Sequence, residues 1–137
     1  MPPRWPVWPF RLLITIAAIL LLLQAVLAGQ FLSGIYASLA AHAANATLAG
    51  FTVLVAAFAA ILLRWPGRGP WWPALATFGL FLLTGFQIGM GYARLLAVHI
   101  PLGVSVIALA GFLTGWSWRY RPARAVTTAR PAAEVAA

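Results

Sequence analysis

Two matching stretches decide the fold: QFLSGIYASLAAH at residues 30–42 and QIGMGYARLLAVH at residues 87–99. They lie 57 positions apart without a gap, and five of their positions are identical, including the first glutamine and the final histidine. A repeat at a fixed offset indicates a duplicated structural unit. The sequence therefore predicts two equivalent helical hairpins, each carrying one histidine, His42 or His99, at the same depth.

The composition predicts an integral membrane protein. Of the 137 residues, 64% are hydrophobic and 7% are charged, and the mean hydropathy is +0.95. A soluble domain of this size could not bury so much apolar surface. We therefore expect an all-α, integral membrane four-helix bundle made of two repeated hairpins. The expected helices are residues 10–33, 36–63, 72–89 and 92–118, within a transmembrane domain at residues 1–120.

The arginines predict the orientation of the chain. All nine basic residues are arginine, and eight of them flank the apolar runs on one side of the predicted membrane, whereas Arg94 lies on the other. By the positive-inside rule both termini are cytoplasmic, and residues 121–137 form a disordered cytoplasmic tail. We expect a multi-pass protein of the cytoplasmic (inner) membrane in contact with lipid. The net charge of +8 follows from this pattern and does not indicate nucleic-acid binding.

A signal peptide is the alternative interpretation of the first apolar run. Arg4 and Arg11 would be its basic end, residues 12–23 its apolar core, and Val26-Leu27-Ala28 its cleavage site. The apolar run continues past Ala28, which favours a membrane span.

Several classes of function are excluded by what the sequence lacks. There are no cysteines, so disulfides, thiolate metal sites and cysteine nucleophiles are excluded. The one acidic residue, Glu134, lies in the tail, so the bundle has no carboxylate general acid or base. Enzymatic activity is left open only as chemistry supplied by a cofactor, in a haem-dependent oxidoreductase.

Two backbone features are expected near the outer face of the membrane. Ser33-Gly34 and Gly89-Met90-Gly91 fall at matching places in the repeat, and we expect each to form a tight turn through the conformational freedom of glycine. Pro101 removes a hydrogen bond to the Ala97 carbonyl and should kink the fourth helix. The freed carbonyl is one acceptor available to a histidine ring nitrogen.

The two histidines, His42 and His99, are the candidate metal ligands. They lie at equal distances from the predicted turns on helices that run in the same direction, which places them opposite each other in the outer half of the bundle. Opposed neutral imidazoles are the axial ligands of a six-coordinate haem iron. The alternatives are a structural hydrogen-bonding role, proton transfer, quinone contact or another metal. Ionisable groups within a membrane bundle are functional by default.

Further residues are expected around this cofactor. Ala46 and Gly103 lie one turn below the histidines, where small side chains leave room for a flat porphyrin. Arg94 at the outer rim would neutralise a haem propionate or, alternatively, contact a lipid headgroup. Gln30 and Gln87 would form hydrogen bonds across the bundle or touch the edge of a ligand.

Three segments resemble one four-helix half of the haem A synthase family, in which each half has a histidine on its second and fourth helices. Residues 41–64, beginning Ala41-His42, resemble the second helix of such a half. Phe86-Gln87-Ile88-Gly89 resembles the end of the third helix, and Ala97-Val98-His99-Ile100 resembles the start of the fourth. The resemblance covers about residues 10–118, and it implies a four-helix bundle with His42 and His99 as haem ligands.

The chain departs from that family in three ways. Ala43 stands where the family commonly has arginine, a short turn replaces the long outer loop with its acidic residue, and only one four-helix unit is present. A homodimer would rebuild two units. The resemblance therefore implies the fold and haem binding but not the oxidation of a haem methyl group. Small four-helix membrane proteins with this layout are closer in pattern.

The sequence thus predicts a b-type haem-binding membrane protein, ligated by His42 and His99, in electron transfer or haem handling. A quinol or a redox partner protein would exchange electrons with it. The second hypothesis is a non-catalytic accessory subunit of a larger membrane complex, without a cofactor. Two pairs of small residues, Gly85 with Gly89 and Gly111 with Gly115, permit close helix packing within one chain or between two.

Overall fold

The fold is an up-and-down bundle of long helices. A computed structural model describes residues 5–122, and this part of the chain contains four helices and no strand. The helices are α1 (Val7–Leu32), α2 (Ser38–Arg64), α3 (Trp72–Tyr92) and α4 (Leu96–Arg119). The predicted all-α architecture is confirmed. The predicted tail lies outside the described residues from residue 123 onward.

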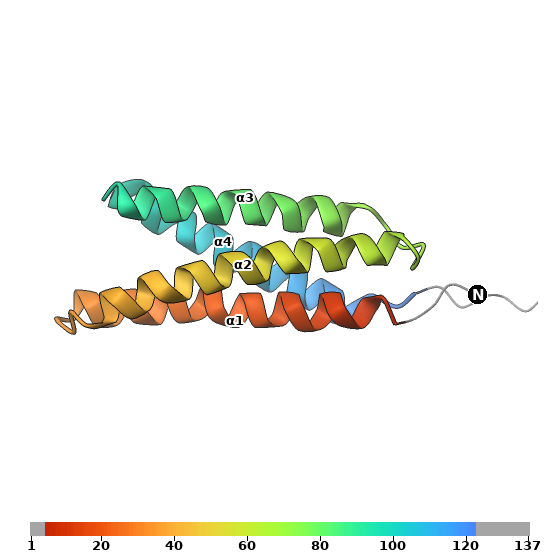
Figure 1. Cartoon of the computed structure of the whole chain (residues 1–137), viewed down its shortest axis with the longest axis horizontal. Helices are drawn as coiled ribbons and strands as arrows, with labels where there is room; N and C mark the ends of the chain where they lie inside the picture. The colour runs from red at the N-terminus through yellow and green to blue at the C-terminus, as the bar shows by residue number, and fades with distance from the viewer. Residues whose placement is uncertain (1–4, 123–137) are drawn as a thin grey trace, which may run out of the picture.

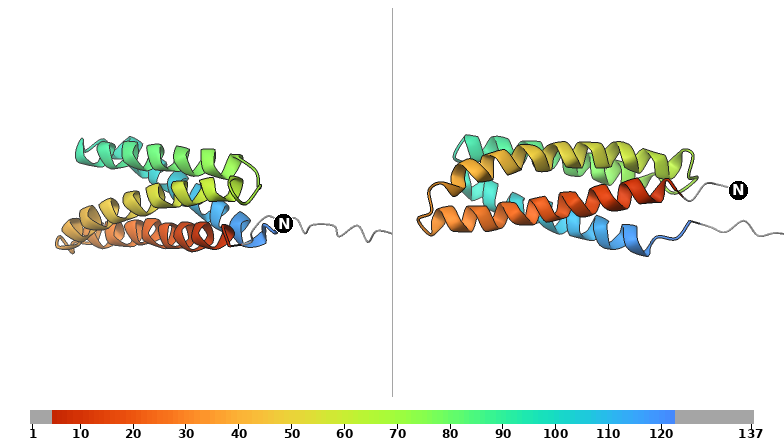
Figure 2. Two further views of the ribbon diagram at one scale, coloured as in Figure 1. Left: turned by 45° about the vertical axis from the view of Figure 1, so that its right-hand side comes forward. Right: turned by 60° about the horizontal axis from the view of Figure 1, so that its bottom comes forward.

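The helices are arranged as a ring in which each contacts its two neighbours (Figure 1). The neighbouring pairs are α1 with α2, α2 with α3, α3 with α4, and α4 with α1, whereas within the described chain no Cα atoms of the diagonal pairs lie within 8 Å of each other. Short loops between antiparallel neighbours produce this topology. As a result α2 and α4 run in the same direction on opposite sides of the bundle, and the left view in Figure 2 shows α4 passing behind α2.

All four helices are long and apolar enough to cross a membrane. Their most apolar windows have mean hydropathies between 1.5 and 2.6, and a bilayer core needs about 20 apolar residues per helix. Large apolar side chains cover the outer surface, such as Leu22, Phe51 and Phe86, each more than half exposed. Such a surface is compatible with lipid rather than with water, so the chain has the features of a multi-pass membrane protein.

The tightly packed core lies at one end of the bundle. On α1 the buried side chains all precede Gln24, on α3 they stop at Thr84, and on α4 they begin at Val106. Phe10, Leu80 and Leu113, from three different helices, are at most 1% exposed in this core. α1 and α3 begin at this end of the bundle, and α4 ends there. The buried side chains of these three helices therefore lie at this end, and the opposite end has no core of comparable density.

Arg11 connects α1 to the last turn of α4 by hydrogen bonds. Its guanidinium donates hydrogen bonds to the carbonyls of Ser117 (2.8 Å) and Tyr120 (2.6 Å). It also lies over the rings of Trp8 and Trp118, at 5.3 and 5.5 Å from their centres. The carbonyls of a last helical turn lack partners within the helix and favour a positive charge. This contact therefore closes the packed end between α1 and α4.

The two turns at the other end share one hydrogen-bond pattern. After α1, Gly34 adopts a φ of 95° and the Ile35 N–H donates to the Gln30 carbonyl at 3.0 Å. After α3, Arg94 adopts a φ of 58° and the Leu95 N–H donates to the Met90 carbonyl at 3.0 Å. Both are Schellman caps, in which a left-handed residue ends the helix.

The second of these turns corrects the predicted one. Gly89 and Gly91 lie within α3, and the left-handed residue is Arg94. The offset of 57 positions that relates the two histidines therefore does not relate the two left-handed turn residues. Eight positions separate Gly34 from His42, whereas five separate Arg94 from His99. The predicted third helix consequently ended three residues too early. The fourth helix begins at Leu96 and remains α-helical through Pro101.

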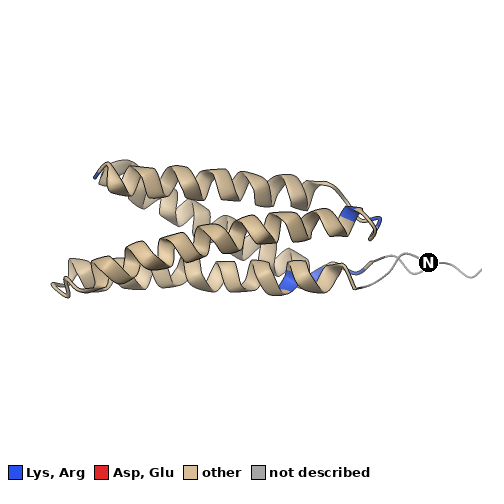
Figure 3. Ribbon diagram, viewed as in Figure 1, with Lys and Arg blue, Asp and Glu red and all other residues tan. Residues whose placement is uncertain are grey.

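The arginines gather at the packed end (Figure 3). There the described arginines are Arg11, Arg64, Arg68, Arg119 and Arg121. Arg94 lies at the opposite end, in the turn between α3 and α4. Arg4, Arg124 and Arg130 lie outside the described residues, as does Glu134. The spatial pattern follows the charge asymmetry read from the sequence.

Candidate functional site

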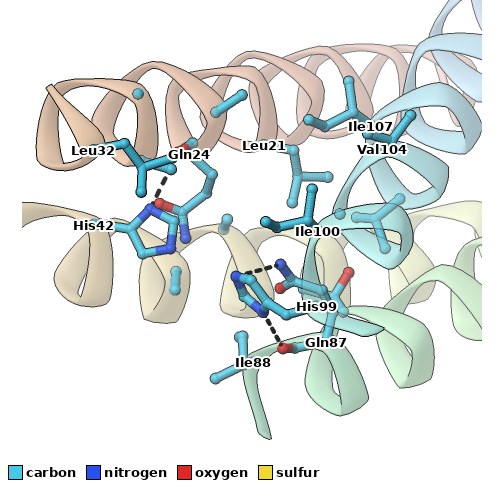
Figure 4. Close-up of a pocket in the computed structure, with 18 residues that line it drawn as sticks. Leu21, Gln24, Leu32, His42, Gln87, Ile88, His99, Ile100, Val104 and Ile107 are labelled. Atoms are coloured by element: carbon cyan, nitrogen blue, oxygen red, sulfur yellow. Dashed lines mark hydrogen bonds between the residues drawn. The ribbon is translucent and has the colours of Figure 1, made fainter. Parts of the chain in front are cut away.

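The two histidines meet in the loosely packed half of the bundle. His42 is the fifth residue of α2 and His99 is the fourth residue of α4. Their ring centres are 6.2 Å apart and the ring planes meet at 65°. The structure thus brings together two side chains from diagonal helices, across the space between all four (Figure 4).

Both imidazoles are oriented by backbone carbonyls of the preceding helix. Nδ1 of His42 lies 3.1 Å from the Gln24 carbonyl oxygen, and Nδ1 of His99 lies 2.8 Å from the Gln87 carbonyl oxygen. A carbonyl oxygen only accepts, so Nδ1 must carry the proton in each ring, and Nε2 of the neutral ring then holds a lone pair. Histidines that ligate metals are oriented in this way. The Ala97 carbonyl freed by Pro101 was one acceptor available to a histidine, but the acceptor for His99 is the Gln87 carbonyl.

His99 is held against α3 by two further features. The Gln87 side-chain nitrogen lies 3.3 Å from Nε2 of His99, so one residue contacts both ring nitrogens. Gly91 leaves a notch for the ring, since a Cβ there would lie 2.8 Å from Cε1 of His99. Glycine is therefore needed at position 91 for contact with the imidazole, and not for an unusual backbone angle.

A cavity of about 270 Å³ surrounds both histidines, and a second of about 200 Å³ adjoins it. Both are largely apolar, and their polar lining residues are the two histidines, the two glutamines that orient them, Thr84 in the larger cavity and Tyr92 in the smaller one. The residues that line both cavities are Gln24, Ala28, Leu32, His42, Ala46, Gln87, Ile88, His99 and Ile100. An apolar pocket with a few convergent polar groups is the usual form of a small-molecule site.

The other predicted site residues divide into two groups. Ala46 lines both cavities and Gly103 lines the larger one, so the small residues lie beside the histidines as expected. Arg94 is exposed in the turn and is not part of either lining. Gln30 is also exposed, and its side-chain oxygen accepts a hydrogen bond from Ser38 at 2.9 Å. Gln87 is therefore the only one of the two predicted amides that reaches the cavity.

Gln24 is a site residue that the sequence interpretation missed. Besides its carbonyl bond to His42, its side chain lines both cavities, and its Oε1 is buried without a hydrogen-bond partner among the described residues. A buried unsatisfied oxygen costs about 1–3 kcal/mol. A lone amide within a long apolar run was the signal that could have identified it.

The donor set restricts which metals the site could hold. Within residues 5–122 no group of three or more histidine, cysteine or acidic side chains comes together. Zinc and copper sites need three or four protein ligands. Two imidazoles suffice only for a metal that brings its remaining ligands with it, as a porphyrin iron does.

The distance between the two rings is compatible with both rings binding one metal ion from opposite sides. A metal–imidazole bond is about 2 Å and the ring nitrogen lies about 1.1 Å from the ring centre, so two rings on opposite faces of one ion have centres about 6 Å apart. The observed 6.2 Å is close to this value. The Gln87 amide would have to rotate away from His99 before Nε2 could bind a metal.

The chain matches no protein-family model, no curated protein and no solved structure. Its function is therefore inferred from the geometry of its own residues.

Proposed function

We propose that this protein is a small membrane cytochrome that holds one b-type haem between His42 and His99. The supporting observation is the 6.2 Å separation of two imidazoles whose Nδ1 atoms both face backbone carbonyls. That pairing leaves an Nε2 lone pair on each ring for an axial bond. Haem would supply one-electron redox chemistry at this site.

The residues around the histidines have separate tasks in this proposal. Ala46 and Gly103 provide flat surfaces on α2 and α4, where larger side chains would fill the cavity. Ile88 and Ile100 contribute apolar side chains to the pocket lining, which would favour a neutral imidazole and a low-dielectric redox site. Arg94, in the turn between α3 and α4, lies at the same end of the bundle as the start of α4, where it would be available to a propionate that projects beyond the cavity.

The role that follows is electron transfer or haem handling. If both imidazoles bound a haem iron, no coordination position would remain open to oxygen, so electron transfer would be favoured over oxygen activation. By the positive-inside rule, the end rich in arginine is cytoplasmic and the histidines lie in the outer half of the membrane. One haem in one leaflet does not carry an electron across the bilayer, so a quinol or a redox partner protein is required.

The two similar hairpins would descend from one duplicated unit.

The proposal is tested with three variants of the full chain, expressed in haem-replete cells and purified in mild detergent. His42→Ala and His99→Ala should each lose the six-coordinate low-spin absorption spectrum. Asn45→Ala is the matched control, because Asn45 also donates to an α1 carbonyl, that of Leu20 at 2.9 Å, but does not line either cavity. If all three variants have the same spectrum as the unaltered protein, the histidines are not haem ligands.

A second candidate function has one observation in its favour. A Cβ on Gly85, Gly89, Gly111 or Gly115 would meet no described atom within 4 Å, so these small residues are not used to pack the chain against itself. Small residues spaced by four allow close approach of another transmembrane helix. An accessory subunit without a cofactor would use these surfaces for a larger complex. In that case the purified protein is colourless, and Gly85→Leu or Gly111→Leu releases it from its partner.

A further inference from the structure

Every tryptophan of the chain belongs to the end of the bundle where the arginines gather. The tryptophans lie at the start of α1, after α2, at the start of α3 and in the last turns of α4: Trp5, Trp8, Trp65, Trp71, Trp72, Trp116 and Trp118. Trp65 is 76% exposed and Trp71 is 53% exposed. Exposed tryptophans lie at the level of the lipid headgroups in membrane proteins. The exposed arginines at this end therefore lie at the same level, namely Arg64, Arg68, Arg119 and Arg121.

Tyr120 connects the end of α4 to the loop between α2 and α3. Its carbonyl accepts a hydrogen bond from Arg11 at 2.6 Å, and its ring stacks on that of Trp116 with ring centres 4.8 Å apart. Its hydroxyl lies beside Gly69, since a Cβ on that glycine would be 2.8 Å from the hydroxyl oxygen. One side chain thus links the last turn of α4 to the loop.

This contact brings arginines from two separate segments together. Arg68 immediately precedes Gly69, and Arg121 immediately follows Tyr120. Of the arginine side chains in residues 5–122, only that of Arg11 donates hydrogen bonds to the described chain, and no acidic residue lies in this range. A guanidinium carries several N–H donors and stays charged. The donors of Arg68 and Arg121 are therefore free to bind an anion from outside the described chain.

Apolar surface adjoins these arginines on the side of the membrane core. Leu75, one turn after Trp71 in α3, is 70% exposed, and Phe112 on α4 is 60% exposed. Phe112 lies near Trp72, with ring centres 6.1 Å apart, so this exposed surface continues from α3 to α4. A phospholipid with an anionic headgroup has a phosphate for the guanidinium groups and acyl chains for the apolar surface. A soluble phosphate lacks the second part.

We infer that Arg68 and Arg121 bind the phosphate of an anionic phospholipid whose acyl chains lie along α3 and α4. Guanidinium groups bind phosphates through paired hydrogen bonds, and the contact between Tyr120 and Gly69 holds the two segments together before the lipid binds. The inference is independent of the proposed haem site, because the arginines lie at the packed end of the bundle and the histidines lie in the other half.

The test is native mass spectrometry of the full-length protein in neutral detergent, with phosphatidylglycerol or phosphatidylcholine added. The unaltered protein should bind a first phosphatidylglycerol more tightly than a first phosphatidylcholine. Arg68→Gln and Arg121→Gln should each weaken phosphatidylglycerol binding roughly fivefold, the effect of one arginine at an anionic lipid, and should leave phosphatidylcholine binding unchanged. Bound haem adds a different mass, so the lipid result is read separately from the haem result.

Arg94→Gln is the matched control, since it removes one exposed arginine from the end of the bundle without tryptophans. Its affinity for phosphatidylglycerol should equal that of the unaltered protein. Equal affinities in Arg68→Gln, Arg121→Gln and the unaltered protein, or an equal loss in Arg94→Gln, would overturn the inference. Glycerol phosphate distinguishes a lipid from a soluble anion. If it displaces phosphatidylglycerol at equal concentration, the site takes a soluble phosphate and the lipid assignment is wrong.

Discussion

The imidazole ring centres of His42 and His99 lie 6.2 Å apart, although the helices that carry them are diagonal in the bundle and have no Cα atoms within 8 Å of each other in the described chain. The two rings come close only because their side chains extend into the space between the helices, which the other residues leave open. Interiors are normally packed to the density of organic crystals. A partly open pocket of about 270 Å³ at the meeting point of two oriented imidazoles is therefore a candidate binding site.

Gly91→Ala should displace His99. The added methyl group would lie 2.8 Å from Cε1 of the ring, closer than side-chain carbons approach in proteins. We expect the helical content to be retained and the affinity for haem to fall at least about tenfold, as when the orientation of a metal ligand is lost. Titration of the apoprotein with haem measures this effect.

Gly89→Ala is the matched control for that variant, because it lies on the same helix and a Cβ there meets nothing within 4 Å in the described structure. Its haem affinity should equal that of the unaltered protein. Equal losses in both variants would indicate a general effect on α3, and no loss in Gly91→Ala would show that the ring is not held in the notch.

Gln24→Leu should stabilise the haem-free protein. The substitution removes a buried Oε1 that has no hydrogen-bond partner among the described residues, and it keeps the backbone carbonyl that orients His42. The expected gain is about 1 kcal/mol in the free energy of unfolding. Thermal unfolding in detergent followed by circular dichroism detects it as a higher Tm.

Gln30→Leu provides the contrast, since Gln30 is exposed and its side chain already has a partner in Ser38. Its Tm should stay the same or fall slightly. A lower Tm in Gln24→Leu than in Gln30→Leu would mean that the Gln24 oxygen has a partner in the haem-free protein.

Much of the fold could be predicted from the sequence, because the apolar runs and the breaker residues between them determine where four helices lie. The turn after α3 was predicted wrongly for a physical reason. Gly89 and Gly91 were interpreted as turn residues, but Gly91 is small because a histidine ring packs on it, and Arg94 takes the left-handed conformation. Composition does not distinguish a glycine needed for contact from one needed for a dihedral angle.

The site was predictable only in part. The histidines were found because ionisable groups are rare in membrane helices, and the small residues followed from helical spacing. Gln24 was not predicted because the gapless repeat pairs Gln87 with Gln30. The carbonyls that orient the rings belong to Gln24 and Gln87, which are 63 positions apart instead of 57. Side chains that face a cavity depend on helix rotation, which a repeat offset does not specify.

Arg11→Met should loosen the packed end of the bundle. It removes two hydrogen bonds to α4 carbonyls and the stacking of the guanidinium on Trp8 and Trp118. We expect a loss of about 2 kcal/mol in the free energy of unfolding, measured by unfolding in mixed detergent micelles. Arg11→Lys should recover only part of this loss, because a single ammonium group does not reproduce the planar fork of arginine.

Arg121→Met is the control for charge alone, since it removes the same charge from an exposed position. Its unfolding free energy should match that of the unaltered protein. If Arg11→Met and Arg121→Met lose the same stability, the Arg11 hydrogen bonds do not hold α1 to α4.

Haem binding is tested most directly by the absorption spectrum of the unaltered protein, purified from haem-replete cells in its oxidised and dithionite-reduced states. We expect a Soret band with sharp α and β bands on reduction, at one haem per chain, as for iron bound by two imidazoles. A folded, helical protein that is colourless, and that remains so when haem is added, would contradict it.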